Sequence, residues 1–222
     1  MQATSTIPIV FTAAAEPVEM GLVASLARPG GNVTGQAIMS AQVSAKWIEI
    51  LTEIAPRARK FAFLGQASNQ AIVAVFRSMQ ETASAHNFSV RLMEAIDPGA
   101  VDRAFKVMVA EKFDGFMVAS APVLLPHRQQ IVDLAVRHRL LAVYARNEYV
   151  TAGGLLSYAQ DRNAMFLRTA DYVHRILQGA KPSNLPVEQP TKFELVINMK
   201  TAKAMGLTIP QTVLIRADQV IQ

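Results

Sequence analysis

The stretch that decides the fold is Phe61-Ala-Phe-Leu64, followed by an apolar series at helical spacing: Ile72, Val75, Phe76, Met79 and Ala83. Four apolar residues in a row predict a buried strand, and steps of three and four residues predict an amphipathic helix after it. The pattern recurs, with further strands starting at Val90, Phe116 and Leu140. Strands separated by helices of about a dozen residues indicate right-handed βαβ crossovers and a parallel sheet.

Shorter patterns flank this alternation on both sides. Residues 7–11 and 33–39 predict two strands, and Glu16-Pro17 predicts the start of a helix that ends at Arg28-Pro-Gly-Gly31. After Gly153-Gly154 we predict a short strand, a long helix ended by Gly179, a proline-rich connection, a strand over 193–197 and a short helix. The chain is therefore expected to be an α/β protein throughout.

Composition narrows the class of protein. Half of the 222 residues are hydrophobic (51%), only 18% are charged, and there is no cysteine. These values predict a large buried core without disulfides or zinc–thiolate sites. No apolar run reaches the ~18 residues that cross a bilayer. The first residues show no basic region followed by an apolar stretch, so we expect no export signal within this chain.

Neither catalysis nor nucleic-acid binding is indicated. The net charge of +5 is scattered, and its one tight cluster, Arg57-Ala-Arg-Lys60, has no interleaved aromatic residues. There is no G-x-S-x-G motif, and the four histidines lie in different predicted elements. Gly30-Gly-Asn-Val-Thr-Gly35 follows a helix and opens a strand, the reverse of a phosphate-binding loop. We therefore predict no catalytic residue, no metal and no cofactor.

Candidate binding loops follow the predicted parallel strands, because open α/β sheets bind ligands at the carboxyl ends of their strands. These loops are residues 12–16, 65–69, 120–122 and 146–148. Helix N-terminal amides there suit a ligand carboxylate, and an acidic side chain could hold an ammonium group. The alternative is that Thr12, Ser68 and Asn69 only cap helices, as these residue types commonly do.

Four segments, in order, resemble one known family. They are Ile7-Pro-Ile-Val-Phe11, the stretch from Leu22 to Gly35, Ala152-Gly-Gly-Leu-Leu-Ser-Tyr158, and the stretch from Lys181 to Pro210. Together they are similar to the substrate-binding proteins of ABC transporters, a family that includes receptors for tryptophan and other aromatic amino acids.

The resemblance implies a two-lobed fold like that of type I periplasmic binding proteins, each lobe a doubly wound parallel sheet. Residues 1–36 and 153–222 would form the first lobe, incomplete at its N-terminus because the family pattern starts earlier. Residues 37–152 would form the second, with hinge crossings near 37–40 and 146–152. Closure of two lobes about such a hinge is one way of enclosing a ligand.

The match also carries over some binding residues. Glu16, Asn69 and Glu148 agree with the family pattern, whereas Ala121 and Asn147 stand where many members have aspartate and arginine. Combining the loops with the resemblance, we expect ligand contacts from Thr12, Ala14, Glu16, Gln66, Ser68, Asn69, Ser120, Glu148, Ser157 and Tyr158.

The function that follows is non-catalytic capture of a small solute, an amino acid or similar zwitterion, in the periplasm for an ABC permease. The alternative is the effector-sensing domain of a regulator with the same two-lobed architecture. A third interpretation is an enzyme, but no phosphate loop or acid/base pair in the sequence supports it. We also expect the incomplete first lobe either to make this chain self-associate through residues 1–36 and 153–222, or to be poorly packed and bind solute weakly.

Overall fold

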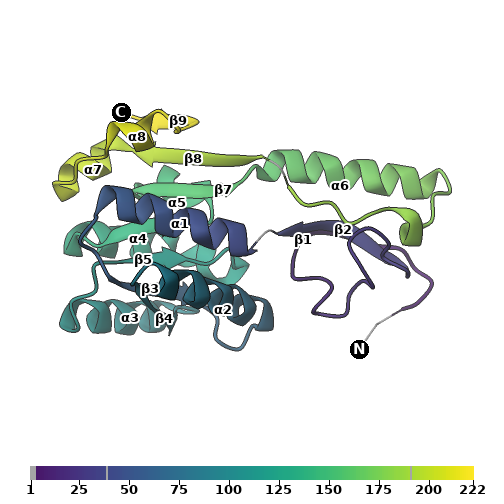
Figure 1. The fold of residues 1–222 in the computed structure, drawn as a ribbon, viewed down its shortest axis with the longest axis horizontal. Coiled ribbons are helices and arrows are strands. Elements are labelled where there is room, and N and C mark those ends of the chain that lie inside the picture. The colour runs from purple at the N-terminus through teal and green to yellow at the C-terminus, as the bar shows by residue number, and fades with distance from the viewer. Residues whose placement is uncertain (1–3, 39, 191) are drawn as a thin grey trace. The chain divides into compact units, whose positions relative to one another are not determined.

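The computed structural model describes residues 4–38, 40–190 and 192–222 (Figure 1). It divides into two compact units, each built from two segments of the chain. Met1–Ser40 and Gln160–Phe193 form the smaller unit, and Ala41–Ala159 and Glu194–Gln222 form the larger unit.

The larger unit is built on a seven-stranded sheet with the order β4-β3-β5-β6-β7-β8-β9. Pairing is parallel between β3 and β4, β3 and β5, β5 and β6, and β6 and β7, as the strand–helix alternation predicts. The strands are β3 (Lys60–Gly65), β4 (Ser89–Glu94), β5 (Gly115–Val118), β6 (Leu141–Tyr144), β7 (Leu156–Gln160), β8 (Phe193–Asn198) and β9 (Gln219–Ile221).

The crossover helices cover both faces of this sheet. The chain moves one way from β3 to β4 and the opposite way from β4 to β5, and each crossover is right-handed by rule. Therefore α2 (Gln70–Ala85) lies on one face, while α3 (Pro98–Ala110) and α4 (Arg128–His138) lie on the other. The remaining helices are α1 (Ser40–Ile54), η1 (Pro122–His127), α5 (Asn147–Thr151), α7 (Met199–Met205) and α8 (Gln211–Leu214).

Burial on both faces explains why the central strands are apolar at nearly every position. The side chains of Phe63, Phe116 and Val143 are fully buried. Phe105 of α3 packs edge-on against Phe116, with the ring centroids 5.2 Å apart. Sheets covered on both sides need such continuous apolar runs rather than alternation.

The sheet is not wholly parallel, which corrects the prediction of purely parallel lobes. The Asn198 amide donates to the Leu155 carbonyl (2.8 Å) and the Asp161 amide to the Lys192 carbonyl (3.3 Å). From the first pair to the second, the residue number on the β7 side rises while the number on the β8 side falls, so β7 and β8 run antiparallel. β9 then pairs parallel to β8.

The smaller unit contains a two-stranded parallel sheet of β1 (Ile9–Ala15) and β2 (Val33–Ile38). Helix α6 (Arg162–Leu177) and the short η2 (Pro182–Asn184) complete it. The side-chain Nε2 of Gln36 on β2 donates to the Met165 carbonyl of α6 at 2.7 Å. Gly35 lets the two strands approach, since a Cβ there would lie 2.0 Å from the Phe11 carbonyl oxygen.

Two sequence-based expectations differ from the structure. No helix forms after Glu16-Pro17; residues 17–21 are turns, and Glu16 has a positive φ of 46° that helix entry does not allow. The predicted lobe boundary at 153 also differs, because β8, α7 and β9 extend the larger sheet and so place residues 194–222 in the larger unit. Residue 39, within the predicted hinge crossing, lies outside the described residues.

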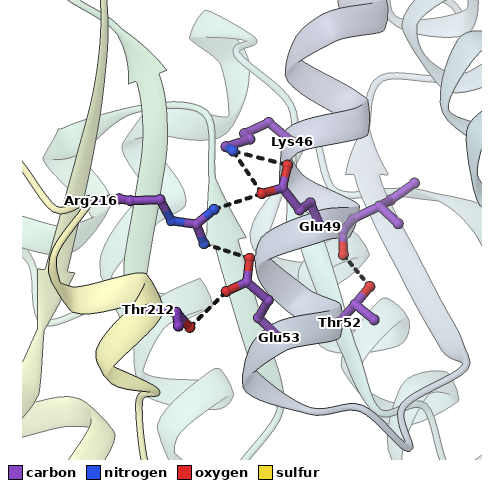
Figure 2. Close-up of polar contacts among 7 residues, drawn as sticks. Lys46, Glu49, Thr52, Glu53, Thr212 and Arg216 are labelled. Atoms are coloured by element: carbon purple, nitrogen blue, oxygen red, sulfur yellow. Dashed lines mark hydrogen bonds and ion pairs between the residues drawn. The ribbon is translucent and has the colours of Figure 1, made fainter.

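A polar cluster fastens the C-terminal segment to α1 within the larger unit (Figure 2). The Arg216 guanidinium donates to Glu49 and to Glu53, each at 2.6 Å, and the Thr212 hydroxyl donates to Glu53 at 3.0 Å. Lys46 also pairs with Glu49 at 2.8 Å. Lys46 and Arg216 hold the pKa of the Glu49 carboxyl below its ordinary value of 4.5.

We expect Gly115→Ala to destabilise the larger unit by roughly 2 kcal/mol or more, because overpacking a core strains its neighbours. An added Cβ would lie 2.3 Å from the Leu141 carbonyl oxygen of β6. Gly99→Ala is the control, since its Cβ would meet only side-chain ends. Urea unfolding should show a loss for the first variant and none for the second; equal stability would contradict the close approach.

We expect Arg216→Gln to cost about 1 kcal/mol at pH 6, the upper range for exposed ion pairs. A depressed carboxyl pKa stabilises the fold above the ordinary pKa and loses that effect as pH falls through the folded-state pKa. The difference between wild type and variant should therefore shrink below pH 4.5. Urea titrations on either side of that pH measure it, and a constant difference would exclude Glu49 as the partner.

Candidate functional site

The topology places one candidate crevice in the larger unit, at the carboxyl ends of β3, β5 and β6. These strands are adjacent and in register from Phe61↔Gly115 to Val118↔Tyr144. The chain leaves β3 toward β4 and returns past it to β5, so the winding reverses between β3 and β5. Open α/β sheets bind ligands at this reversal point. The loops after the three strands share that edge.

The loop after β3 is held by backbone and side-chain bonds. Asn69 caps α2, its Oδ1 accepting from the amides of Ala71 (3.0 Å) and Ile72 (3.4 Å). The Glu94 carboxylate accepts from the Ala67 amide at 3.1 Å. Asn69 thus caps a helix, and a ligand contact by the same side chain stays a prediction.

Three other predicted residues at this edge keep their polar groups uncommitted. Ser68 and Ser120 are exposed, and Gln66 is half-buried. Their side chains have no hydrogen-bond partner among the described residues. They are therefore available to a solute that approaches this edge of the sheet.

After β6, a buried arginine stands at the same edge. Arg146 has only 8% of its surface exposed, and its Nη2 donates to the Glu148 carboxylate at 2.6 Å. Its buried Nε has no partner within the described part of the chain. Buried donors are nearly always paired in native proteins, so the unpartnered Nε is a position at which the acceptor of a solute can bond.

Two stacked tyrosines lie beside Arg146. The rings of Tyr144 and Tyr149 are parallel within 7° with centroids 4.8 Å apart. Burial raises the pKa of both phenols, and the charge of Arg146 opposes that rise at Tyr149. Both hydroxyls are therefore neutral donors at physiological pH, and neither has a partner among the described residues.

Asn147 connects the segment after β6 to β7 and β8. Its Oδ1 accepts from the Ser157 hydroxyl at 2.8 Å, and its Nδ2 donates to the Glu194 carboxylate at 3.1 Å. Ser157 is fully buried, so its hydroxyl serves this internal network. Tyr158 lies toward Glu49 and Asp218, and burial, together with these carboxylates, raises its pKa.

The other predicted residues lie in the smaller unit, on or just after β1. Thr12 caps no helix, and its Oγ1 accepts from the Thr169 hydroxyl of α6 at 3.3 Å. Ala14 and Glu16 are half-buried. Of the ten predicted contacts, Gln66, Ser68, Asn69, Ser120 and Glu148 lie at the carboxyl edge of β3, β5 and β6.

Sequence reasoning did not select Arg146 or Asn147 as site residues. Both lay in a loop that had been identified, yet only the acidic residue was chosen from it. A basic residue two positions after a buried parallel strand is itself a signal of a candidate site residue. Its charge must be either exposed or paired at the carboxyl edge of the sheet.

Other possible sites are weaker. A groove of about 220 Å³ runs between β4 and α3, and two of its three polar lining residues, Arg91 and Glu94, are committed to Glu111 and to the Ala67 amide. Among the described residues no group of His, Asp or Glu could hold a metal ion. Within the same residues, no helix has the length and apolar character needed to span a membrane.

Comparison with known proteins gives consistent results. A family model described as ABC transporter substrate binding protein matches residues 1–221. The "Tyrosine-binding protein" of Clostridioides difficile (strain R20291) is 26% identical over 206 residues, which are 92% of this chain and 59% of that protein. The chain thus spans about three fifths of the length of this relative.

Two solved structures share the fold over nearly the whole chain. A conserved domain protein from Vibrio cholerae has a TM-score of 0.90 and 30% identity, covering 98% of this chain and 73% of its own. An ABC domain from Streptococcus pneumoniae, solved in complex with L-Trp, has a TM-score of 0.88 and 26% identity, covering 99% and 75%.

We expect Asn69→Ala to lower the stability of the larger unit by about 1 kcal/mol, the usual cost of a lost N-cap. Asn69→Asp should keep most of that stability, because a carboxylate also accepts from the first-turn amides. Chemical denaturation of the three proteins compares them. Wild-type stability in Asn69→Ala would show that the cap contributes nothing.

Proposed function

The chain belongs to the family of ABC transporter substrate binding proteins, and from this premise we propose that it captures an amino acid, preferably an aromatic one, for an ABC importer. Its partner is then a membrane permease, and its place is outside the cytoplasm, where such receptors meet their solutes. The protein binds and releases its solute unchanged.

The observation that carries the proposal is a group of uncommitted polar side chains at one edge of the larger unit's sheet, in a chain of this family. Gln66, Ser68 and Ser120 present free hydrogen-bonding groups at the reversal point of the sheet. One relative of 26% identity was solved in complex with L-Trp, and another is named a tyrosine-binding protein. These relatives support an aromatic amino acid as the solute class.

Arg146 supplies the charge that such a solute needs. A guanidinium is planar and binds a carboxylate through parallel hydrogen bonds. Nη2 is paired with Glu148, while the buried Nε lacks a partner among the described residues. We assign the solute carboxylate to Arg146. Glu148 positions the guanidinium, and with 41% of its side chain exposed it also offers an acceptor to the solute ammonium group.

The experiment is isothermal titration of the purified chain with L-tryptophan, L-tyrosine and L-phenylalanine. Two analogues separate the contributions of the two charges to affinity. Tryptamine lacks the carboxylate, and indole-3-propionate lacks the ammonium group. We expect binding of at least one aromatic amino acid and loss of affinity for tryptamine. Binding of none of the three would contradict the proposed solute class.

Arg146→Gln tests the assigned residue. Removing one partner of a buried charge pair costs about 2–5 kcal/mol, or at least a thirtyfold loss of affinity. Arg137→Gln is the matched control, since Arg137 is exposed on α4 and makes no charged contact among the described residues. Equal affinity of both variants for the aromatic amino acid would refute the assignment to Arg146 without refuting solute binding.

A further inference from the structure

Residues 146–148, which we call the site segment, contain one side chain that the proposed function leaves without a role, that of Asn147. The bond from Arg146 to Glu148 joins two side chains of the site segment itself. It orients the guanidinium on Glu148 but does not attach the segment to the sheet. The two bonds of Asn147 leave the segment, because they reach Ser157 on β7 and Glu194 on β8. Asn147 is therefore placed to fix the segment on its framework.

The two partners of Asn147 are matched by an amide. A carboxylate only accepts hydrogen bonds, so Glu194 needs the Nδ2 donor, which lies 3.1 Å away. The fully buried Ser157 hydroxyl donates to Oδ1 at 2.8 Å. An ionised aspartate in place of Asn147 could accept from Ser157 but could not donate to Glu194. The amide is what allows both bonds at once.

The attachment lies just beyond the end of the backbone pairing between β6 and β7. The described register of these strands ends at Tyr144↔Ser157. Asn147 comes three residues after Tyr144 and bonds back to the same Ser157. Its side chain thus continues the attachment to β7 where the backbone bonds stop, and extends it to β8. Both bonds are partly buried, where hydrogen bonds are electrostatically stronger than in water.

The strands β7 and β8 are also the segments by which the chain leaves the larger unit and returns to it. One segment of the larger unit ends at Ala159, two residues after Ser157, and the last segment begins at Glu194. A third connection enters α1, whose Trp47 Nε1 donates to the Tyr158 carbonyl at 2.8 Å. Inside the larger unit, the site segment is therefore bonded to two of the strands through which the chain passes between the units.

We propose that Asn147 is a positioning residue of the solute site, which sets the place of Arg146 through β7 and β8 and couples solute binding to those two strands. The inference rests on the proposed function, because it concerns the residue assigned to the solute carboxylate. Coupling between two sites is reciprocal. Strands that hold Arg146 in its binding position are themselves stabilised when the solute binds, although the solute does not need to contact them.

Isothermal titration of the full chain with L-tryptophan, L-tyrosine and L-phenylalanine measures the positioning effect. Asn147→Ala should lower the affinity for the amino acid that wild type binds by at least about fivefold, the equivalent of one ordinary hydrogen bond. Asn198→Ala is the matched control. Asn198 is a buried amide at the other end of β8, and its Oδ1 accepts from the Thr201 amide at 3.1 Å. This variant should lose stability and keep wild-type affinity.

An exchange of the two polar groups tests the bond itself. Asn147→Asp alone sets a carboxylate against Glu194 and should weaken binding. Adding Glu194→Gln supplies an amide that donates to the new carboxylate, while Ser157 still donates to its other oxygen. Both bonds return with donor and acceptor exchanged. The double variant should therefore recover affinity to within about threefold of wild type, since residues in contact act non-additively.

Amide hydrogen exchange at saturating concentrations of the same amino acid measures the coupling. Exchange in residues 156–160 and 193–198 should slow in wild type and stay unchanged in Asn147→Ala. Far-UV circular dichroism establishes that each variant is folded.

Four results would overturn the inference while leaving solute binding intact: wild-type affinity in Asn147→Ala, an equal loss in Asn198→Ala, no recovery in the double variant, or equal protection of both strands with and without Asn147. Binding of none of the three amino acids to wild type would instead refute the proposed function, and this inference with it.

Discussion

The handedness of the crossovers on either side of β3 is the constraint on which the rest of the larger unit depends. Because β4 lies on one side of β3 and β5 on the other, right-handed connections must place α2 and α3 on opposite faces. Both faces of the strands are then buried, which requires the continuous apolar runs seen at Phe63 and Phe116. The same reversal separates the connections that leave β3 and β5, which is the place where open α/β sheets bind ligands.

The segment after β6 shows how charge is used at that edge. Arg146 is nearly buried and held by Glu148, while the next residue, Asn147, bonds to Ser157 of β7 and Glu194 of β8. Burying a guanidinium is costly unless it is paired and hydrogen-bonded. The bond to Glu148 offsets part of that cost, and a solute carboxylate would offset more. Under the proposed function, the unpartnered Nε of Arg146 is the position at which the solute carboxylate binds.

The strand–helix alternation from Phe61 to Tyr144 could be predicted from sequence because each element has a clear hydrophobic period. The antiparallel β8 could not, since no local pattern distinguishes its direction from that of its neighbours. The expected helix after Pro17 failed because proline at a first turn permits a helix without requiring one, and Glu16 adopts a positive φ. At the candidate site, the loop positions followed from topology alone. The pairing of Arg146 with Glu148, and the burial of Ser157, depend on side-chain directions that spacing does not encode.

Amide hydrogen exchange with and without L-tryptophan tests most directly whether solute binds at the carboxyl ends of β3, β5 and β6. Contacts with a solute should slow exchange in residues 65–72, 119–122 and 145–149, the segments that surround the reversal point. The account predicts protection in these three segments together. Protection confined to the groove between β4 and α3, with these segments unchanged, would contradict it.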